Sequence, residues 1–144
     1  EMVRLALASE EDPCFTVATL EVRRSGPTYS EETLQVLRAE GHGGIWFICG
    51  ADTLTDLPHW HDPAALLALA RFVVAPRPNS PLDLDALDAA VPGLRERVDF
   101  LSMEPINLSA SELRAARRSD DSLDPRIPAA AREYIERKRL YEPA

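Results

Sequence analysis

Polar and aromatic residues that could contact a ligand follow the apolar run Ile45–Cys49. Gly50 and Asp52 come directly after this run. A glycine at the end of a strand lets a ligand approach the backbone closely. Asp52 either accepts hydrogen bonds from ribose hydroxyls or caps the next helix. Further on, Trp60 either stacks on a flat heterocycle or packs in the core. Both alternatives stay open at Asp52 and at Trp60.

A second group of polar residues is typical of an anion site at the start of a helix. Ser109 and Glu112 have the spacing of a capping box, which predicts a helix that begins here. The free N–H groups and hydroxyls of a helix start bind anions, most often phosphate. Arg114, one turn into the helix, points at the same anion or lies along the surface. The capping box alone explains Ser109 and Glu112.

Two histidines, His59 and His61, stand on either side of Trp60 and raise the question of a metal site. Histidines at positions i and i+2 can share one ion when the chain is extended. A metal site in a protein needs further ligands, and no third ligand has a suitable spacing here. We therefore expect no metal site formed by these residues.

The elements that must position these residues alternate between strand and helix. The continuous apolar run at 45–49 predicts a strand that is buried on both faces. Alternation predicts another strand at Phe15–Leu20, and apolar runs predict strands at 72–75 and 98–101. We expect helices at 1–9, 30–39 with Ser30 as its cap, 52–57, from 63 with Asp62 as its cap, 83–91, from 109 with Ser109 as its cap, and 128–139. This order predicts one α/β domain over residues 1–144 with a mostly parallel sheet flanked by helices.

Composition narrows the class of protein. The chain has 144 residues, 45% of them hydrophobic, and a formal net charge of −8, which argues against non-specific nucleic-acid binding. No apolar run reaches the length of a membrane span. Cys14 and Cys49, the only cysteines, lie in apolar segments, so we expect two reduced, buried thiols in a cytoplasmic protein. The oligomeric state is left open, with a homo-oligomer as one option.

Five motifs follow one another in a fixed order. They are Arg24–Leu34 (RSGPTYSEETL), Gly50-Ala51-Asp52 with Leu57-Pro58-His59-Trp60, Phe72–Pro78 (FVVAPRP), Leu108–Arg114 (LSASELR), and Pro128–Ile135 with Leu140-Tyr141. In this order they resemble the bacterial nicotinate mononucleotide adenylyltransferases over nearly the whole chain. The resemblance implies a Rossmann-like nucleotidyltransferase fold.

The resemblance also implies a reaction and a set of site residues. The family transfers AMP from ATP to nicotinate mononucleotide and forms deamido-NAD and pyrophosphate, with Mg²⁺ accompanying ATP. ATP and nicotinate mononucleotide are thus the expected partners. By resemblance Trp60 would stack on the nicotinate ring, with Thr28 and the backbone near His61 close to its carboxylate. The remaining positions, by resemblance, are Gly50 and Asp52 beside the ribose and phosphate, Arg77 near the nucleotide cleft, and Ser109, Ser111 and Arg114 at the ATP phosphates.

The chain departs from the family pattern at three points. Ala110 stands where a second serine is usual, and His61 stands where a tyrosine is common. The first strand and the loop with the histidine–x–glycine–histidine motif have no counterpart in this sequence. We therefore expect the catalytic histidines upstream of Glu1 and assign no catalytic residue here. The alternatives are a related nucleotidyltransferase with another acceptor and a non-catalytic nucleotide-binding or assembly module.

Overall fold

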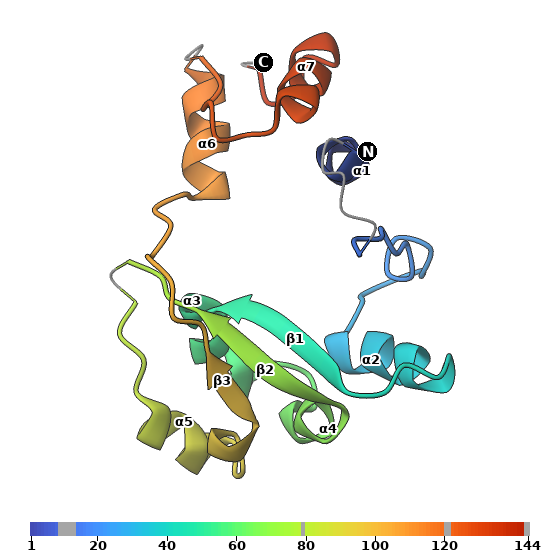
Figure 1. Ribbon diagram of the computed structural model, residues 1–144, viewed down its shortest axis with the longest axis vertical. Helices are drawn as coiled ribbons and strands as arrows, with labels where there is room; N and C mark the ends of the chain where they lie inside the picture. The colour runs from blue at the N-terminus through green and yellow to red at the C-terminus, as the bar shows by residue number, and fades with distance from the viewer. Residues whose placement is uncertain (9–13, 79, 120–121, 143–144) are drawn as a thin grey trace. The chain divides into compact units, whose positions relative to one another are not determined.

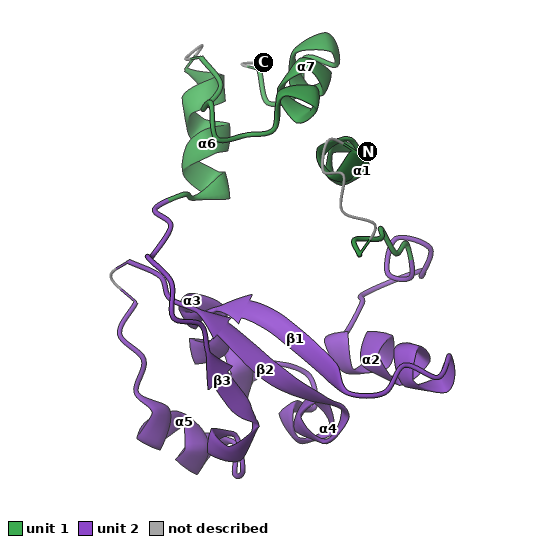
Figure 2. Cartoon of the chain, in the orientation of Figure 1, with its two compact units in different colours: residues 1–19, 108–144 green, residues 20–107 purple. Residues whose placement is uncertain are grey.

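The chain divides into two compact units, which are described here one at a time (Figure 2). A computed structural model describes residues 1–8, 14–78, 80–119 and 122–142. One unit comprises residues 20–107, and the other comprises residues 1–19 together with 108–144. The single domain expected from the sequence stays a prediction.

A parallel sheet of three strands forms the frame of the 20–107 unit (Figure 1). The strands β1 (Ile45–Gly50), β2 (Ala70–Ala75) and β3 (Val98–Phe100) lie in the order β1-β2-β3. In the register of β1 with β2, Gly50 lies beside Ala75. The residues that follow these two strands therefore lie side by side at the carboxyl end of the sheet.

Short helices connect and cover these strands. They are α2 (Ser30–Ala39), α3 (Ala51–Thr55), the 3-10 turn η1 (Leu57–His59), α4 (Pro63–Leu69), α5 (Leu84–Ala90) and the 3-10 turn η2 (Arg95–Arg97). Leu54, Leu57 and Leu66 are almost fully buried and form one core with Phe72 of β2. Because α2 packs against α4, the start of α2 lies near the turn that precedes α4.

The sheet is covered on one face only within the described residues. Phe72 and Val74 of β2 point into the core, whereas Trp46 and Ile48 of β1 are 58% and 71% exposed. The prediction that β1 is buried on both faces is therefore wrong. An apolar run of this kind predicts that a segment forms a strand. Whether both faces of the strand are buried depends on which other segments pack against them.

A side chain caps each of three helices, and two of these caps, Asp62 and Ser109, were predicted. Asp62 caps α4 and accepts a hydrogen bond from the N–H of Ala65 at 3.0 Å. Asp83 caps α5 in the same way, and Ser109 caps helix α6 (Ala110–Arg118) by accepting from the N–H of Glu112 at 3.4 Å. A side-chain oxygen at each N-cap pairs with a helix N–H that would otherwise lack a partner.

One cap prediction is wrong, and one of the two alternatives left open for Asp52 is excluded. Ser30 is the first residue of α2 rather than its cap, which is Tyr29. Asp52 does not cap α3, because Gly50 occupies the N-cap position and Asp52 lies in the first turn. A carboxylate in the first turn still interacts favourably with the helix dipole. The carboxylate of Asp52 forms an ion pair with Arg77 instead of capping the helix.

The strand predicted at residues 15–20 is also wrong. Residues 15–19 form no regular structure, and Phe15 is 60% exposed. An alternating pattern forms a strand only where another strand supplies hydrogen-bond partners, and in the described part of the chain no strand pairs with these residues. Cys14 is exposed and Cys49 is half-buried, so the prediction of two buried thiols is wrong as well.

The second unit is helical over its described residues. It contains α1 (Met2–Ala8), α6 (Ala110–Arg118) and α7 (Ala129–Arg137), and α1 packs against α7. Ala131 and Ile135 are the buried side chains of α7. Among the described residues no helix is long and apolar enough to cross a membrane.

Candidate active site

A cleft of about 280 Å³ lies between the start of α2 and the turn after η1. Its lining residues are Thr28, Tyr29, Ser30, Glu31, His59, Trp60 and His61. Asp62 makes this geometry possible, because it adopts a left-handed backbone conformation with φ 43° while capping α4. Aspartate tolerates this conformation better than most residues. This turn brings Trp60 and His61 to the same cleft as Thr28, which precedes them by about 30 residues in the sequence.

Trp60 both packs on the core and lines this cleft. Its ring meets Phe47 edge-on, with the ring centroids 5.8 Å apart and an interplanar angle of 73°. Edge-to-face pairs of this kind are favourable, and they fix the plane of the indole. The two alternatives considered for Trp60 are therefore compatible, since core packing holds one edge of a ring that also faces the cleft.

His61 is held by two neighbours. Its ring stacks on Tyr29, with centroids 4.3 Å apart and an interplanar angle of 24°. Its Nδ1 forms a short hydrogen bond with the carboxylate of Glu31. Glu31 is only 4% exposed, and its Oε2 is buried with no hydrogen-bond partner among the described residues.

Sequence reasoning missed the contact between Glu31 and His61. One signal could have found it. Glu31 precedes the buried Leu34 by three residues, and residues three apart lie on the same helix face. That face points into the core, so Glu31 had to be buried, and a buried carboxylate needs a partner.

A second cluster forms where β1 and β2 end. Asp52 and Arg77 make an ion pair with 3.4 Å between Oδ1 and Nε. A Cβ atom on Gly50 would lie 2.3 Å from Asp52 Oδ1 and 3.2 Å from Arg77 Nε. A side chain at position 50 would therefore displace the carboxylate of Asp52 from this position. The three residues are thus in contact, as the register of the two strands requires.

Cys49 lies next to this cluster and is not a nucleophile. Burial raises the pKa of its thiol to about 11, and the negative charge of Asp52 adds to this increase. The thiolate is the reactive form of cysteine, and at neutral pH this group remains a thiol.

Ser109, Ser111 and Arg114 belong to the helical unit. Ser109 caps α6, and Arg114 donates a hydrogen bond from Nη2 to Ser111 Oγ at 3.3 Å. Arg114 is exposed, so its guanidinium can turn from Ser111 to an anion at the helix start. The three side chains lie within the first turns of one helix, which is the arrangement that an anion site at a helix N-terminus uses.

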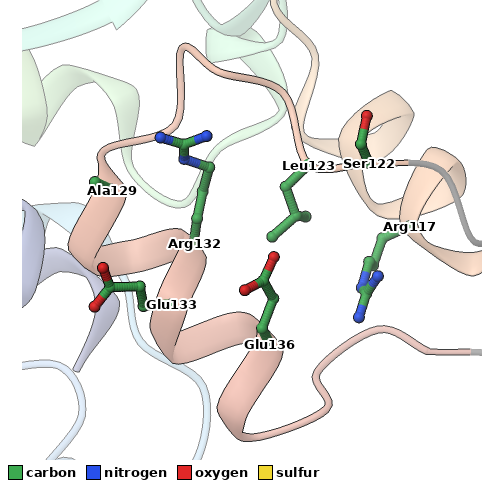
Figure 3. A pocket seen from close by; sticks show the side chains of 7 residues that line it. All are labelled: Arg117, Ser122, Leu123, Ala129, Arg132, Glu133 and Glu136. Carbon is green, nitrogen blue, oxygen red and sulfur yellow. The ribbon is translucent and has the colours of Figure 1, made fainter.

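The helical unit also contains a pocket of about 350 Å³ (Figure 3). Arg117 of α6 and Arg132, Glu133 and Glu136 of α7 line it. Arg117 is paired with Glu142 at 2.9 Å. Because the lining mixes charges of both signs, we assign it no ligand. No group of three or more His, Cys, Asp or Glu side chains within the described ranges could hold a metal ion.

Comparison with known proteins places the chain in a family. No protein-family model matches it. It is 38% identical over 140 residues to a probable nicotinate-nucleotide adenylyltransferase of Roseiflexus sp. (strain RS-1), covering 97% of this chain and 69% of that protein. It is 36% identical over 141 residues to the probable nicotinate-nucleotide adenylyltransferase of Thermomicrobium roseum, covering 97% of this chain and 66% of that protein. The chain thus spans about two thirds of the length of these relatives.

Solved structures support the fold. The Plasmodium falciparum nicotinic acid mononucleotide adenylyltransferase complexed with APC matches with a TM-score of 0.62 and 18% identity, over 88% of this chain and 64% of that one. The same protein complexed with NaAD also has a TM-score of 0.62, over 81% of this chain. The predicted α/β, Rossmann-like nucleotidyltransferase fold is confirmed by this likeness and by the parallel sheet. From its relatives, this chain belongs to the nicotinate-nucleotide adenylyltransferase family of enzymes.

Proposed function

We propose that the protein transfers AMP from ATP to nicotinate mononucleotide and forms deamido-NAD and pyrophosphate, in the biosynthesis of NAD. The cleft lined by Thr28, Trp60 and His61 carries this proposal. It joins an aromatic ring with a hydroxyl and an imidazole, which suits a flat pyridine ring that carries a carboxylate. Family membership supports the same conclusion, because the relatives are named for this activity.

On the acceptor side, Trp60 stacks on the nicotinate ring. Its contact with Phe47 fixes the plane of the indole before the ligand arrives, which lowers the entropy lost on binding. The hydroxyl of Thr28 and the residue His61 lie at the same cleft and face the carboxylate of that ring.

Gly50, Asp52 and Arg77 bind the ribose and phosphate of the acceptor. Asp52 accepts hydrogen bonds from ribose hydroxyls, and Arg77 supplies a positive charge for the phosphate. The two side chains are 51% and 40% exposed, so both can reach a ligand while remaining paired. The absence of a Cβ on Gly50 leaves room for them.

Ser109, Ser111 and Arg114 hold the phosphates of ATP. The N-terminus of α6 presents free N–H groups and a favourable dipole, and the two hydroxyls and the guanidinium add donors for phosphate oxygens. Transfer of a nucleotidyl group depends mainly on positioning and on stabilising charge. Ala110, which lies between the two serines, has no hydroxyl. Ser109 and Ser111 are therefore the residues that supply hydroxyl groups here.

Mg²⁺ accompanies ATP in this proposal. No cluster of metal-binding side chains occurs in the part of the chain that the structure describes. We therefore assign the ion to the phosphates of the substrate rather than to a protein site, and no step is assigned to it.

The test is product formation by the full-length protein with ATP, Mg²⁺ and nicotinate mononucleotide. We expect deamido-NAD and pyrophosphate in equal amounts. Equal rates with nicotinate and nicotinamide mononucleotide would contradict the assigned preference for the acid. If other phosphate-bearing acceptors reacted and nicotinate mononucleotide did not, the alternative of a related nucleotidyltransferase would hold instead.

Calorimetry separates an enzyme from a scaffold. We expect ATP and nicotinate mononucleotide each to bind in a saturable manner. Absence of binding for both ligands would favour a non-catalytic assembly module.

A further inference from the structure

Glu31 is the one buried charged residue in the ranges that the structure describes. Burying an isolated carboxylate is costly unless a partner balances its charge. One of its oxygens contacts His61 Nδ1, and the other is buried without a hydrogen-bond partner among the described residues. Both residues line the cleft that we assign to the acceptor.

This contact decides which nitrogen of His61 carries a proton. A carboxylate only accepts hydrogen bonds, so Nδ1 is the donor. The second nitrogen, Nε2, is then a donor when the ring is an imidazolium and an acceptor when the ring is neutral. The side chain of His61 is 57% exposed, and His61 is one of the residues that line the cleft.

We propose that the Glu31–His61 pair selects between a carboxylate and a carboxamide on the pyridine ring of the acceptor, an inference that rests on the proposed function. With the imidazolium, Nε2–H donates to a carboxylate and the charge of Glu31 is balanced. With the neutral ring, Nε2 accepts from a carboxamide N–H and the charge of Glu31 remains. Binding of the acid therefore requires a proton on Nε2 of His61, whereas binding of the amide does not require one. Glu31 acts through His61 and is a positioning residue.

Other ionisable groups near this pair are few. Tyr29 stacks on the ring of His61, and His59 lines the same cleft. The carboxylate of Asp62 accepts from the N–H of Ala65 at the start of α4. Glu31 is the group among these that contacts a ring nitrogen of His61.

Three variants differ in the charges that remain at this pair, so each should affect acid and amide binding differently. Replacing His61 with glutamine leaves the buried charge of Glu31 without a cation, and this charge repels an acidic ligand. Replacing Glu31 with glutamine removes the anion that stabilises the imidazolium. The double variant removes both charges and leaves a neutral cleft.

The experiment measures kcat/KM in the full-length protein with nicotinate mononucleotide and with nicotinamide mononucleotide at pH 7. We expect His61→Gln to lower the value for the acid by about tenfold or more, mainly through KM, because one charge-assisted hydrogen bond is lost. The value for the amide should stay within about threefold. Adding Glu31→Gln to His61→Gln should restore part of the loss, because the repelling charge is removed.

A pH profile and two matched controls complete the test. In the wild type the ratio of the two kcat/KM values, acid over amide, should fall as the pH is raised, because the acid is bound by the charged ring. In the double variant the ratio should be flat. Glu40→Gln and His42→Gln make the same chemical changes at exposed positions and should leave the ratio unchanged.

Two results would overturn the role of the pair. One is an equal loss for both acceptors in His61→Gln. The other is a double variant that discriminates no better than His61→Gln. Neither result affects the proposed function, which fails separately if the wild type forms no dinucleotide from either acceptor. In that case calorimetry of both acceptors in two buffers still measures proton uptake. Equal uptake for the acid and the amide, or no binding of either, would overturn the role of the pair.

Discussion

At the scale of single residues, two contacts explain most of the chemistry that we assign. Trp60 has one edge against Phe47 and lines the acceptor cleft. Gly50 leaves the space in which Asp52 and Arg77 meet. At both places the same residue takes part in packing and has a proposed role in binding the acceptor. Substitutions there can separate the effect on stability from the effect on binding.

Trp60→Ala should raise the KM for nicotinate mononucleotide far more than the KM for ATP. Stacking of an aromatic side chain on a base contributes about 1–3 kcal/mol, which corresponds to roughly 5- to 150-fold in affinity. Steady-state kinetics with each substrate varied in turn give both values. Trp60→Phe keeps a ring and should lie between the wild type and Trp60→Ala. Equal increases for the two substrates would assign Trp60 to the core alone.

Gly50→Ala should disrupt the ion pair of Asp52 with Arg77. The added Cβ would lie 2.3 Å from Asp52 Oδ1, so the carboxylate must move. Since small displacements of positioning groups are costly, we expect kcat/KM for the acceptor to fall by about ten- to a hundredfold. The melting temperature should change little, because exposed ion pairs contribute little to stability.

Gly43→Ala is the matched control for this substitution. A Cβ at Gly43 would have no heavy atom within 4 Å. Its activity should match that of the wild type. If both alanine variants behaved alike, the packing around Gly50 would have no part in binding.

At the scale of elements, helix starts position the proposed site. The turn between η1 and α4 brings His61 to the cleft, and Asp62 stabilises this turn through its cap and its backbone conformation. The start of α6 presents Ser109 and Ser111. Both elements are short, so their caps contribute a large share of the interactions that define them.

Asp62→Ala should destabilise the protein more than Asp83→Ala does. Each substitution removes one N-cap, at a cost of about 1 kcal/mol. Asp62 also has φ 43°, whereas Asp83 has φ −92°, so alanine at 62 adds about 1–2 kcal/mol for a left-handed conformation. Urea unfolding of both variants gives the difference. Asp62→Asn keeps an acceptor and tolerates the conformation, and it should resemble the wild type. Equal losses at 62 and 83 would contradict this account.

Arg114→Ala should mainly impair the use of ATP. The guanidinium of Arg114 lies one turn into α6 and bonds Ser111, at the helix start that we assign to phosphate. Loss of one charge-assisted contact should raise the KM for ATP by about tenfold. Arg118→Ala, in the last turn of the same helix, is the control and should have no effect. An unchanged dependence on ATP in Arg114→Ala would exclude the phosphate role.

At the scale of the whole molecule, the sequence predicted what local physics determines. The strands at 45–49, 72–75 and 98–101 and the caps at Asp62 and Ser109 were predicted nearly as the structure has them. Apolar runs and side-chain acceptors at helix starts act over a few residues, so they can be recognised without a partner segment.

What the sequence could not predict depends on distant segments. Residues 15–20 alternate but have no strand to pair with, and β1 is apolar on a face that no described residue covers. The contact of Glu31 with His61 and that of Asp52 with Arg77 require the packing of α2 on α4 and the register of β1 with β2. The substrate roles of the site residues remain predictions for the experiments above.

The most direct measurement of the central claim follows the α-phosphate of ATP. The full-length protein is incubated with ATP labelled at the α-phosphorus, Mg²⁺ and nicotinate mononucleotide, and the products are separated. We predict that the label enters deamido-NAD, with one unlabelled pyrophosphate released for each dinucleotide formed. Label that stays in ATP although both substrates bind, or that appears only in free AMP, would contradict the assignment of this protein as an adenylyltransferase.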